Sequence, residues 1–506
     1  MLIADLLTQL PDICHVGAGV EPGAVLQGAR SDTRFLRAQD LFIALPGVRS
    51  QGVDYLAEAL ERGCRAALVP NDVELPAHLA RYCIGVDRIR YNAALAACAV
   101  YNQPTRHLLT FGVTGTNGKT STCHILKHLL EAAGHRVVML TTVAHEYEGW
   151  RRETPNTTPD AALLQETLDR ARRQGATAAV LEVSAHGVLL DRIAGSVFDG
   201  LVFTNLSLDH QDFFDGIEPY FAQKLRLFTE ARFHKPACVA AIGTADEFGH
   251  RIHRATALPH LTFGESVRPD GDPPDITVAT VTASARGLQG RLSVRGQIFA
   301  VDTTLSSDFN RYNIAGALAV AVQAGLSAEA LRLALTQAIR VPGRLMCVPG
   351  TAPFQVIVDF AHTDSALGNL LQGLRKDCTG KLIVVFGAGG DKDPARRFTL
   401  PRVVIDLADV GIITLDNPRS EPPQQIIDTM VGHWRELART HASPALLLVE
   451  PDRKAAIVSA LQQATAGDII ILAGKGHETT QIFADRIEPH DDFALASAWL
   501  TARGLG

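Results

Sequence analysis

The stretch from His107 to Gly134, HLLTFGVTGTNGKTSTCHILKHLLEAAG, constrains the fold of this chain more than any other. Its first apolar run predicts a buried strand, and apolar residues at helical spacing after position 124 predict an amphipathic helix. Between them, Gly112, Gly115 and Gly118 let the backbone turn sharply and approach a ligand closely. A helix that starts at such a turn directs unpaired N–H groups and a partial positive charge at the turn, which suits a bound phosphate.

The side chains of this loop add two groups for a nucleotide. Lys119 supplies a full positive charge for the outer phosphates of ATP, and the Thr120 hydroxyl is placed to bind Mg²⁺. The GxxxxGK[ST] pattern is met except at its first position, where Val113 replaces glycine. The alternative is a glycine turn that caps a helix and binds nothing. We predict a nucleotide site made by Gly115, Thr116, Asn117, Gly118, Lys119, Thr120 and Ser121.

Composition narrows the class of protein. A chain of 506 residues is long enough for three domains. The formal net charge of −6 argues against non-specific nucleic-acid binding, which needs a basic face. The eight cysteines include no CxxC pair and fit reduced thiols. The start, MLIADLLTQLPD, predicts a short helix and no signal peptide, and no apolar run reaches the length of a membrane span. We expect a cytoplasmic protein with no membrane or nucleic-acid partner.

Short apolar runs alternate with helical patterns throughout, which predicts an α/β fold with parallel sheets. Two polar, proline-containing joints, YNQPTRH and IRVPGR, divide the chain into residues 1–105, 106–340 and 341–506. In the second block, ATAAVLEVS and FDGLVFTNLS read as strands with polar ends. In the third block, we predict strands with polar ends at FQVIVDFAH, KLIVVFGAGG, DVGIITLDNPR and DIIILAGKGHE. Polar strand ends are typical of the ligand-binding edge of a doubly wound sheet.

Three polar residues of the second block carry groups that could bind metal or phosphate. Glu182 ends a buried strand across from the glycine loop, where a carboxylate can bind Mg²⁺ or cap a helix. His210 lies in the cluster TNLSLDHQDFF, which is a metal or phosphate site or a capped loop. Lys224 follows in a predicted helix and, taken alone, reads as a solvated lysine.

Taken together, the motifs resemble the Mur ligase family of ATP-dependent, amide-forming enzymes of peptidoglycan precursor synthesis. The resemblance rests on their order along nearly the whole chain: GTNGKTS, EVSAHG, TNLSLDH, SDFNRYN, VPGR, VDFAH, GAGGDKD, DNPR and AGKGHE. It implies an N-terminal UDP-sugar-binding α/β domain, a central P-loop ATPase-type domain and a C-terminal Rossmann-like domain for the amino acid. It also implies that a substrate carboxylate attacks the γ-phosphate of ATP, and that an amine attacks the resulting acyl phosphate.

The resemblance carries roles over to individual residues. For catalysis and metal binding it implies Lys119 on the phosphates, Thr120 and Glu182 on one Mg²⁺, His210 on a second metal ion, and a carbamylated Lys224. For ATP it adds Asn313, Arg344 and Asp359. For the sugar-dipeptide it implies Thr33, Thr157, Thr158, Ser184 and Arg192.

The tetrapeptide DNPR points to the branch that adds meso-diaminopimelate to UDP-MurNAc-L-Ala-D-Glu. Arg419 can hold the second carboxylate of this amino acid with two parallel hydrogen bonds, and Glu478 with the Gly474 carbonyl can receive its ammonium group. The alternative for DNPR is an Asx-Pro turn. The resemblance implies an amino-acid site made by Lys392, Asp416, Asn417, Arg419, Gly474 and Glu478.

Several positions depart from the family pattern. They include Val48 and Arg49 in the first block, Leu190 after SAHG, and Lys392 in GGDKD. The phosphate and metal positions are kept, so the main hypothesis stays the ligase that adds meso-diaminopimelate, and the departures leave one alternative open: a paralogous ligase with another carboxylate acceptor. A catalytically silent nucleotide-binding protein and a folate-polyglutamylating ligase are weaker alternatives, since the former does not need Lys224 and the latter does not explain DNPR. We expect a monomer.

Overall fold

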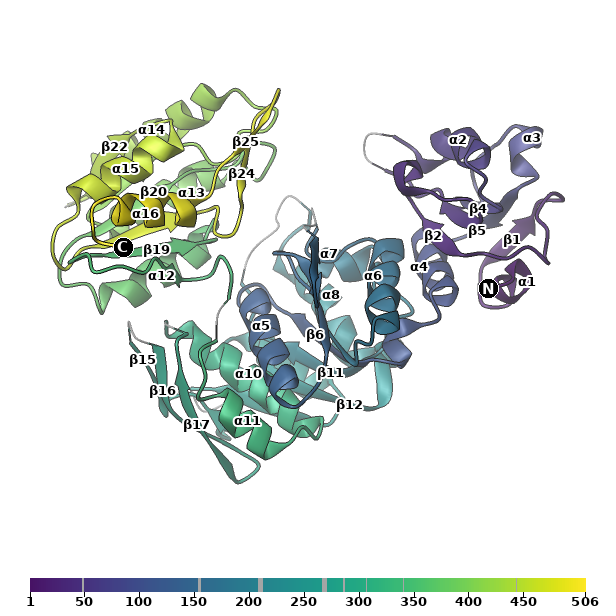
Figure 1. Ribbon diagram of the computed structural model, residues 1–506, viewed down its shortest axis with the longest axis horizontal. Helices are drawn as coiled ribbons and strands as arrows, with labels where there is room; N and C mark the ends of the chain where they lie inside the picture. Colours follow the sequence, from purple (N-terminus) through teal and green to yellow (C-terminus); the bar gives the residue numbers. More distant parts are fainter. Residues whose placement is uncertain are drawn as a thin grey trace.

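The structure is a computed structural model that describes residues 1–47, 50–152, 156–207, 213–265, 271–284, 287–305, 307–339, 341–442 and 444–506. Figure 1 shows three sheet-centred bodies along the chain, with the N-terminal body at one end, the phosphate-loop body in the middle and the C-terminal body at the other end. The α/β fold with parallel sheets is confirmed, because each of the three bodies is built on a largely parallel sheet.

The N-terminal body holds a five-stranded sheet of order β1-β5-β4-β3-β2, in which only β1 is antiparallel to its neighbour. Alternating apolar residues such as Leu41, Ile43 and Leu68 bury one face against helices. The strands are β1 (Ile13–Val16), β2 (Gly28–Arg30), β3 (Asp40–Ile43), β4 (Ala66–Pro70) and β5 (Cys83–Val86). The helices are α1 (Ile3–Leu7), α2 (Leu56–Glu61), α3 (Ala77–Ala80) and α4 (Ile89–Val100).

The central body holds a nine-stranded sheet of order β14-β13-β12-β11-β6-β10-β7-β8-β9, parallel except for the β7-β8-β9 meander. The strands are β6 (Leu109–Thr114), β7 (Val137–Leu140), β8 (His145–Tyr147), β9 (Trp150–Arg152), β10 (Ala178–Glu182), β11 (Phe198–Phe203), β12 (His234–Gly243), β13 (His260–Gly264) and β14 (Ile276–Thr277). The helices are α5 (Lys119–Ala132), α6 (Ala161–Arg173), α7 (Ala185–Leu189), α8 (Ile217–Thr229) and α9 (Glu247–Ala255). Because β6 pairs with β10 and β11, the ends of these three parallel strands meet at one edge of the sheet.

A three-stranded antiparallel sheet and two helices complete this body. The strands are β15 (Val281–Ser284), β16 (Gly287–Val294) and β17 (Gln297–Thr303), and the helices are α10 (Phe309–Gln323) and α11 (Ala328–Ala334). Helix α10 is buried along most of its length, between the nine-stranded sheet, α5 and the small sheet. A helix that is apolar all round in this way belongs in a core.

The C-terminal body holds a six-stranded sheet of order β18-β19-β23-β20-β21-β22, antiparallel only at β18. The strands are β18 (Met346–Cys347), β19 (Gln355–Asp359), β20 (Leu382–Phe386), β21 (Val410–Ile413), β22 (Leu446–Val449), β23 (Ile469–Ala473) and the separate hairpin β24 (Thr480–Ile482) and β25 (Ile487–Pro489). The helices are α12 (Asp364–Arg375), α13 (Arg396–Leu407), α14 (Pro423–Ala438), α15 (Arg453–Gln463) and α16 (Asp492–Thr501). The four strands predicted in this block are confirmed as β19, β20, β21 and β23.

Specific contacts join neighbouring bodies. The Arg30 guanidinium at the end of β2 donates to Glu166 of α6 at 2.9 Å. Lys376 after α12 donates to Asp308 at the start of α10 at 3.2 Å, and Phe309 packs against the core of the C-terminal sheet. Across the described part of the chain, no helix is long and apolar enough to cross a membrane.

Candidate functional site

The glycine loop turns between β6 and α5 as the sequence predicts. Gly118 caps α5 with φ of 83°, in the left-handed region that favours glycine, and Gly115 has φ of 149°. A Cβ atom on Gly115 would lie 1.9 Å from Thr204 Oγ1, and one on Gly118 would lie 2.3 Å from Asn313 Oδ1. Both positions therefore need glycine for close packing as well as for backbone angle.

Hydrogen bonds fix the loop against the end of β11. The Asn117 amide N–H donates to Asn205 Oδ1 at 3.1 Å, and Thr204 Oγ1 donates to the Asn117 carbonyl at 2.6 Å. Thr116 Oγ1 donates to the Ser207 carbonyl at 3.1 Å. These hydrogen bonds hold the loop in a defined shape, as a phosphate cradle needs.

The two functional side chains of the loop have defined partners. Lys119 Nζ donates to the Thr116 carbonyl at 2.7 Å, which holds the ammonium group against its own loop. Thr120 Oγ1 donates to Glu182 Oε2 at 3.0 Å, and both side chains are buried. The structure therefore brings together the lysine, the hydroxyl and the carboxylate that the sequence analysis assigned to phosphates and Mg²⁺.

Glu182 is the centre of a wider network at this edge of the sheet. Thr142, just after β7, donates to Glu182 Oε2 from its backbone N–H at 3.0 Å and to Oε1 from its hydroxyl at 3.1 Å. Thr142 is not among the site residues predicted from the sequence. The signal was present, because Thr142 follows the apolar run VVML in the same way that Glu182 ends its own strand.

The oxygen donors at this point suit a magnesium ion. A threonine hydroxyl and a buried carboxylate are hard oxygen ligands of the kind that Mg²⁺ takes together with water and phosphate oxygens. No cluster of three or more His, Cys, Asp or Glu side chains that could hold a metal ion occurs among the described residues. His210 lies outside the described residues. A Mg²⁺ ion held by Thr120 and Glu182 would take its other ligands from a nucleotide and water.

Lys224 is buried inside the central body, one turn of α8 away from Tyr220. Its Nζ donates to the Gly115 carbonyl at 2.7 Å and lies 4.5 Å from the centre of the Tyr220 ring. The solvated lysine that the residue alone suggested is therefore wrong. The ammonium group of Lys224 lies against the backbone of the phosphate loop.

The residues assigned to the sugar-dipeptide fall into two places. Thr158 Oγ1 lies 3.1 Å from Ser184 Oγ, and Arg192 Nη1 donates to the Thr158 carbonyl at 2.7 Å. Thr157 Oγ1 lies within hydrogen-bond distance of Thr142 Oγ1, at 3.0 Å, and Thr142 in turn connects this group to Glu182. Thr33 belongs to the N-terminal body, where its buried hydroxyl donates to Glu58 at 3.2 Å. Val48 and Arg49 lie outside the described residues.

The three further ATP candidates lie on two bodies. Asn313 in α10 accepts from Thr122 Oγ1 of α5 at 3.3 Å, directly behind the phosphate loop. Asp359 ends β19 and accepts backbone N–H groups of Leu345 and Ala361, both at 2.7 Å. Burial raises the pKa of Asp359, and the nearby Arg344 guanidinium opposes this rise.

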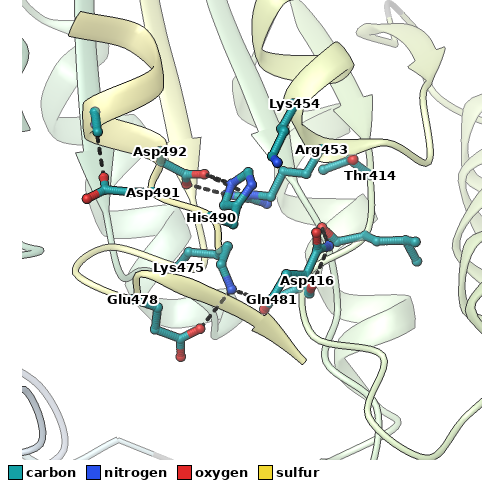
Figure 2. A network of polar contacts seen from close by, with 12 residues as sticks. Thr414, Asp416, Arg453, Lys454, Lys475, Glu478, Gln481, His490, Asp491 and Asp492 are labelled. Atoms are coloured by element: carbon teal, nitrogen blue, oxygen red, sulfur yellow. Dashed lines mark hydrogen bonds and ion pairs between the residues drawn. The ribbon is translucent and has the colours of Figure 1, made fainter. Parts of the chain in front are cut away.

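Residues of DNPR and AGKGHE meet at the ends of β21 and β23 in the C-terminal body (Figure 2). Asn417 Nδ2 donates to Glu478 Oε2 at 2.7 Å, and the buried Lys475 Nζ donates to the same carboxylate oxygen at 2.9 Å. Burial would raise the pKa of Glu478, but Lys475 and Asn417 outweigh it and lower the pKa below the usual range. Glu478 is therefore an anion at neutral pH.

Arg419 and Asp416 both have atoms that are buried without a hydrogen bond. Arg419 Nη1 and Asp416 Oδ1 lack hydrogen-bond partners within the described ranges. A Cβ atom on Gly474 would lie 3.5 Å from Asp416 Oδ2, so the two loops pack closely. A buried polar atom without a partner needs an explanation, and a bound ligand or water is one of them. Lys392 is exposed on the loop after Gly390, whose N–H donates to the Asn417 carbonyl at 2.9 Å.

Fold and site together define an α/β nucleotide-binding protein in which a phosphate loop faces a second sheet domain across a joint. A model of the Mur ligase middle domain matches residues 113–321, and one of the Mur ligase glutamate ligase domain matches residues 343–476. The chain belongs to the Mur ligase family, whose enzymes depend on ATP.

Relatives match nearly the whole chain. The UDP-N-acetylmuramoyl-L-alanyl-D-glutamate--2,6-diaminopimelate ligase of Solibacter usitatus is 37% identical over 94% of both chains. The ligase of the same name from Geobacillus kaustophilus is 34% identical over 100% of both.

Solved structures share the fold. A UDP-N-acetylmuramoyl-L-alanyl-D-glutamate--2,6-diaminopimelate ligase matches with a TM-score of 0.65 and 29% identity, covering 95% of this chain and 96% of its own. The MurF ligase from Thermotoga maritima in complex with ADP also has a TM-score of 0.65, at 17% identity, covering 94% of this chain and 98% of its own. At this lower identity the likeness concerns the fold alone.

Proposed function

We propose that this protein is an ADP-forming ligase that joins meso-diaminopimelate to UDP-MurNAc-L-Ala-D-Glu through an acyl-phosphate intermediate, in peptidoglycan precursor synthesis. Relatives that match this chain over nearly its whole length carry the name of that reaction. The phosphate loop, with Lys119 and Thr120 beside Glu182, supports the ATP-dependent half of the reaction.

One observation carries the choice of amino acid. Arg419 has a buried guanidinium nitrogen without a partner, two residues after an asparagine that is hydrogen-bonded to the anionic Glu478. A guanidinium binds a carboxylate with two parallel hydrogen bonds, and a carboxylate binds an ammonium group. Diaminopimelate carries both groups on its distal carbon, whereas lysine carries only the ammonium group. The pair Arg419 and Glu478 therefore favours diaminopimelate.

The reaction brings several anions together, so its catalysis is mainly positioning and positive charge. Lys119 binds the β- and γ-phosphates, and an oxygen of the substrate carboxylate attacks the γ-phosphorus while ADP leaves. The amine nitrogen of the amino acid then attacks the acyl carbon, loses a proton and displaces inorganic phosphate. Mg²⁺ held by Thr120 and Glu182 would neutralise charge on the phosphate oxygens.

Lys224 and His210 are assigned to the second Mg²⁺ in this proposal. Carbamylation would turn the Lys224 ammonium, now at the Gly115 carbonyl, into an anionic group that can bind a metal ion. Its buried position beside the loop supports a structural or metal-binding role over a solvated one.

The remaining assignments belong to the same proposal. Residues 1–105, with Thr33, bind the UDP-sugar, residues 106–340 bind ATP, and residues 341–506 bind the amino acid. The substrate carboxylate lies near Thr157, Thr158, Ser184 and Arg192, whose network reaches Glu182 through Thr142. Asn313, Arg344 and Asp359 bind ATP. The protein acts as a cytoplasmic monomer.

A second candidate keeps the chemistry and changes the acceptor. Leu190, Lys392, Val48 and Arg49 depart from the family pattern at substrate positions, while the phosphate and carboxylate positions keep it. Such a paralogue would have changed the part of the site that binds the acceptor and kept the part that binds ATP.

Release of ADP and phosphate by the purified protein tests both candidates. We would cross UDP-MurNAc-L-Ala-D-Glu and other carboxylates against meso-diaminopimelate, lysine and other amino acids, with ATP and Mg²⁺ present. Phosphate release with a new amide only for the first acceptor and diaminopimelate supports the proposal. Turnover with another carboxylate alone supports the second candidate, and no turnover with any pair contradicts both. Lys119→Ala is the control and should abolish phosphate release.

A further inference from the structure

Lys475 is a fully buried lysine that the sequence analysis left without a role. It follows Gly474 at the end of β23, and its side chain has no exposed surface. Figure 2 shows its ammonium group between Glu478 and Asp416. A buried ammonium group is costly unless it is paired and hydrogen-bonded, so its position calls for a reason beyond packing.

The hydrogen bonds of Lys475 determine how Asn417 is oriented. Asn417 Oδ1 accepts from Lys475 Nζ at 3.0 Å and from the Ile482 backbone N–H at 3.0 Å. Two donors on this side require the amide oxygen there, which turns the Nδ2 donor toward Glu478. Lys475 thereby determines which end of Asn417 faces Glu478.

Glu478 is held by the same lysine. Its Oε2 accepts from both Lys475 and Asn417, whereas Oε1 has no hydrogen bond in the part of the chain that the structure describes. The Glu478 side chain is 30% exposed, while that of Lys475 is wholly buried. Oε2 is therefore fixed by two hydrogen bonds, and Oε1 is available to a ligand.

The charges around Lys475 come from several elements. Asp416 after β21 lies 3.7 Å from Nζ, and Glu478 lies in the loop after β23. Arg453 of α15 is paired with Asp492 of α16 at 2.7 Å, so this second pair is neutral. One lysine facing two carboxyl groups leaves at most one excess negative charge, which complements a single ammonium group.

We infer that Lys475 is a positioning residue that sets selectivity for the amino acid: by fixing Asn417 and Glu478 it presents one carboxylate oxygen to the distal ammonium group of the substrate. This inference rests on the proposed function, and it adds a residue that need not contact the substrate. Without Lys475, Asn417 is free to turn over and Glu478 loses one of its two anchors.

The test compares meso-diaminopimelate with 2-aminopimelate, which keeps the distal carboxylate and lacks the distal ammonium group. The wild type should prefer diaminopimelate in kcat/KM by about tenfold to a hundredfold, the usual worth of a hydrogen bond to a charged group. Lys475→Met should bring this ratio close to one by raising KM for diaminopimelate. KM for ATP and turnover of 2-aminopimelate should change by less than about threefold, the usual scatter of such effects. Lys454→Met, an exposed lysine in α15, is the matched control and should keep the wild-type ratio.

Lys475→Met leaves the Glu478 carboxylate without its buried counter-charge, so a double variant that also neutralises Glu478 covers the case in which the single variant does not fold. Glu478→Gln should lose the preference by itself, and Lys475→Met/Glu478→Gln should lose no more, because one residue acts through the other. A folded Lys475→Met that keeps the wild-type ratio overturns the inference, and so does a further loss in the double variant. If the wild type does not use diaminopimelate at all, both the proposed function and this inference fail.

Discussion

At the scale of the residue, Arg419 has two features that indicate function. Its φ is 54°, a left-handed conformation that costs energy in any residue with a Cβ atom, and its Nη1 is buried without a hydrogen-bond partner in the described ranges. The backbone is held by the bond from its N–H to the Ile482 carbonyl at 3.0 Å, in the same hairpin strand that anchors Asn417. In our proposal, this strained backbone directs the Arg419 guanidinium toward the amino acid.

Replacing the Arg419 guanidinium with an ammonium group tests whether binding of the amino acid needs the guanidinium geometry. Arg419→Lys keeps the charge and the backbone strain but loses the planar pair of donors. We expect KM for diaminopimelate to rise by about tenfold to a hundredfold, with KM for ATP unchanged, in phosphate-release assays. Arg435→Lys on the exposed side of α14 is the control. An unchanged KM for diaminopimelate in Arg419→Lys would contradict the assignment.

Asp492 illustrates a buried charge whose role is structural. Burial would raise its pKa, but the Arg453 guanidinium and His490 outweigh burial and hold the pKa well below its usual range. A carboxyl group with a lowered native pKa stabilises the fold fully above its unfolded pKa, near pH 4. That stabilisation declines as the pH falls below the unfolded pKa and is gone once the pH has fallen through the native pKa.

Asp492→Asn leaves Arg453 buried without its counter-ion. We expect it to lower the free energy of unfolding by about 3–5 kcal/mol at pH 7, and the difference from wild type to shrink at acid pH. Urea unfolding followed by tryptophan fluorescence measures it between pH 7 and pH 3, because two of the three tryptophans, Trp434 and Trp499, lie beyond residue 341. Asp491→Asn, an N-cap for which asparagine is an equivalent, is the control. Equal losses in the two variants would refute the role of the pair.

At the scale of the element, the phosphate loop depends on how closely α5 and α10 approach each other. Gly118→Ala would place a methyl group 2.3 Å from Asn313 Oδ1 in addition to the strain of a positive φ. Gly134→Ala has the same strain, with φ of 87°, and meets no atom within 4 Å. The two variants therefore separate backbone strain from displacement of α10.

We expect both glycine variants to lose about 1–2 kcal/mol of stability from the left-handed backbone. Only Gly118→Ala should raise KM for ATP, by about tenfold or more, because its methyl group displaces a residue assigned to ATP; a factor of ten corresponds to about 1.4 kcal/mol. Thermal unfolding and ATP titration of the phosphate-release rate measure the two effects. A similar KM for ATP in both variants would show that the loop tolerates the displacement.

Elements of this kind are readable from sequence because their signals are local. The predicted strands around Glu182 and Asp416, and the helix after Gly118, appear as β10, β21 and α5, since apolar runs and glycine turns act over a few residues. Lys475 was missed because its role depends on burial and on Asn417, 58 positions away in the chain. A lysine between two glycines carries no local signal that it lies inside a core.

At the scale of the whole molecule, the residues assigned to ATP belong to bodies that are joined by few specific contacts. Asn313 lies behind the phosphate loop, whereas Asp359 ends a strand of the C-terminal sheet. Lys376 of the C-terminal body nevertheless donates to Asp308 at the start of α10, so this body contacts the helix that packs against α5.

A site shared between two bodies should close when its ligands bind, because ATP can contact both sets of residues only if they approach each other. We predict a smaller radius of gyration by X-ray scattering when a non-hydrolysable ATP analogue and the UDP-sugar dipeptide are added together. Closure would also exclude water from the acyl phosphate, which water would otherwise hydrolyse. Lys119→Ala, which loses a phosphate contact, should keep the open radius under the same conditions. If the wild-type radius stays constant while bound nucleotide is detected, the two bodies act without closing and Asp359 has no part in ATP binding.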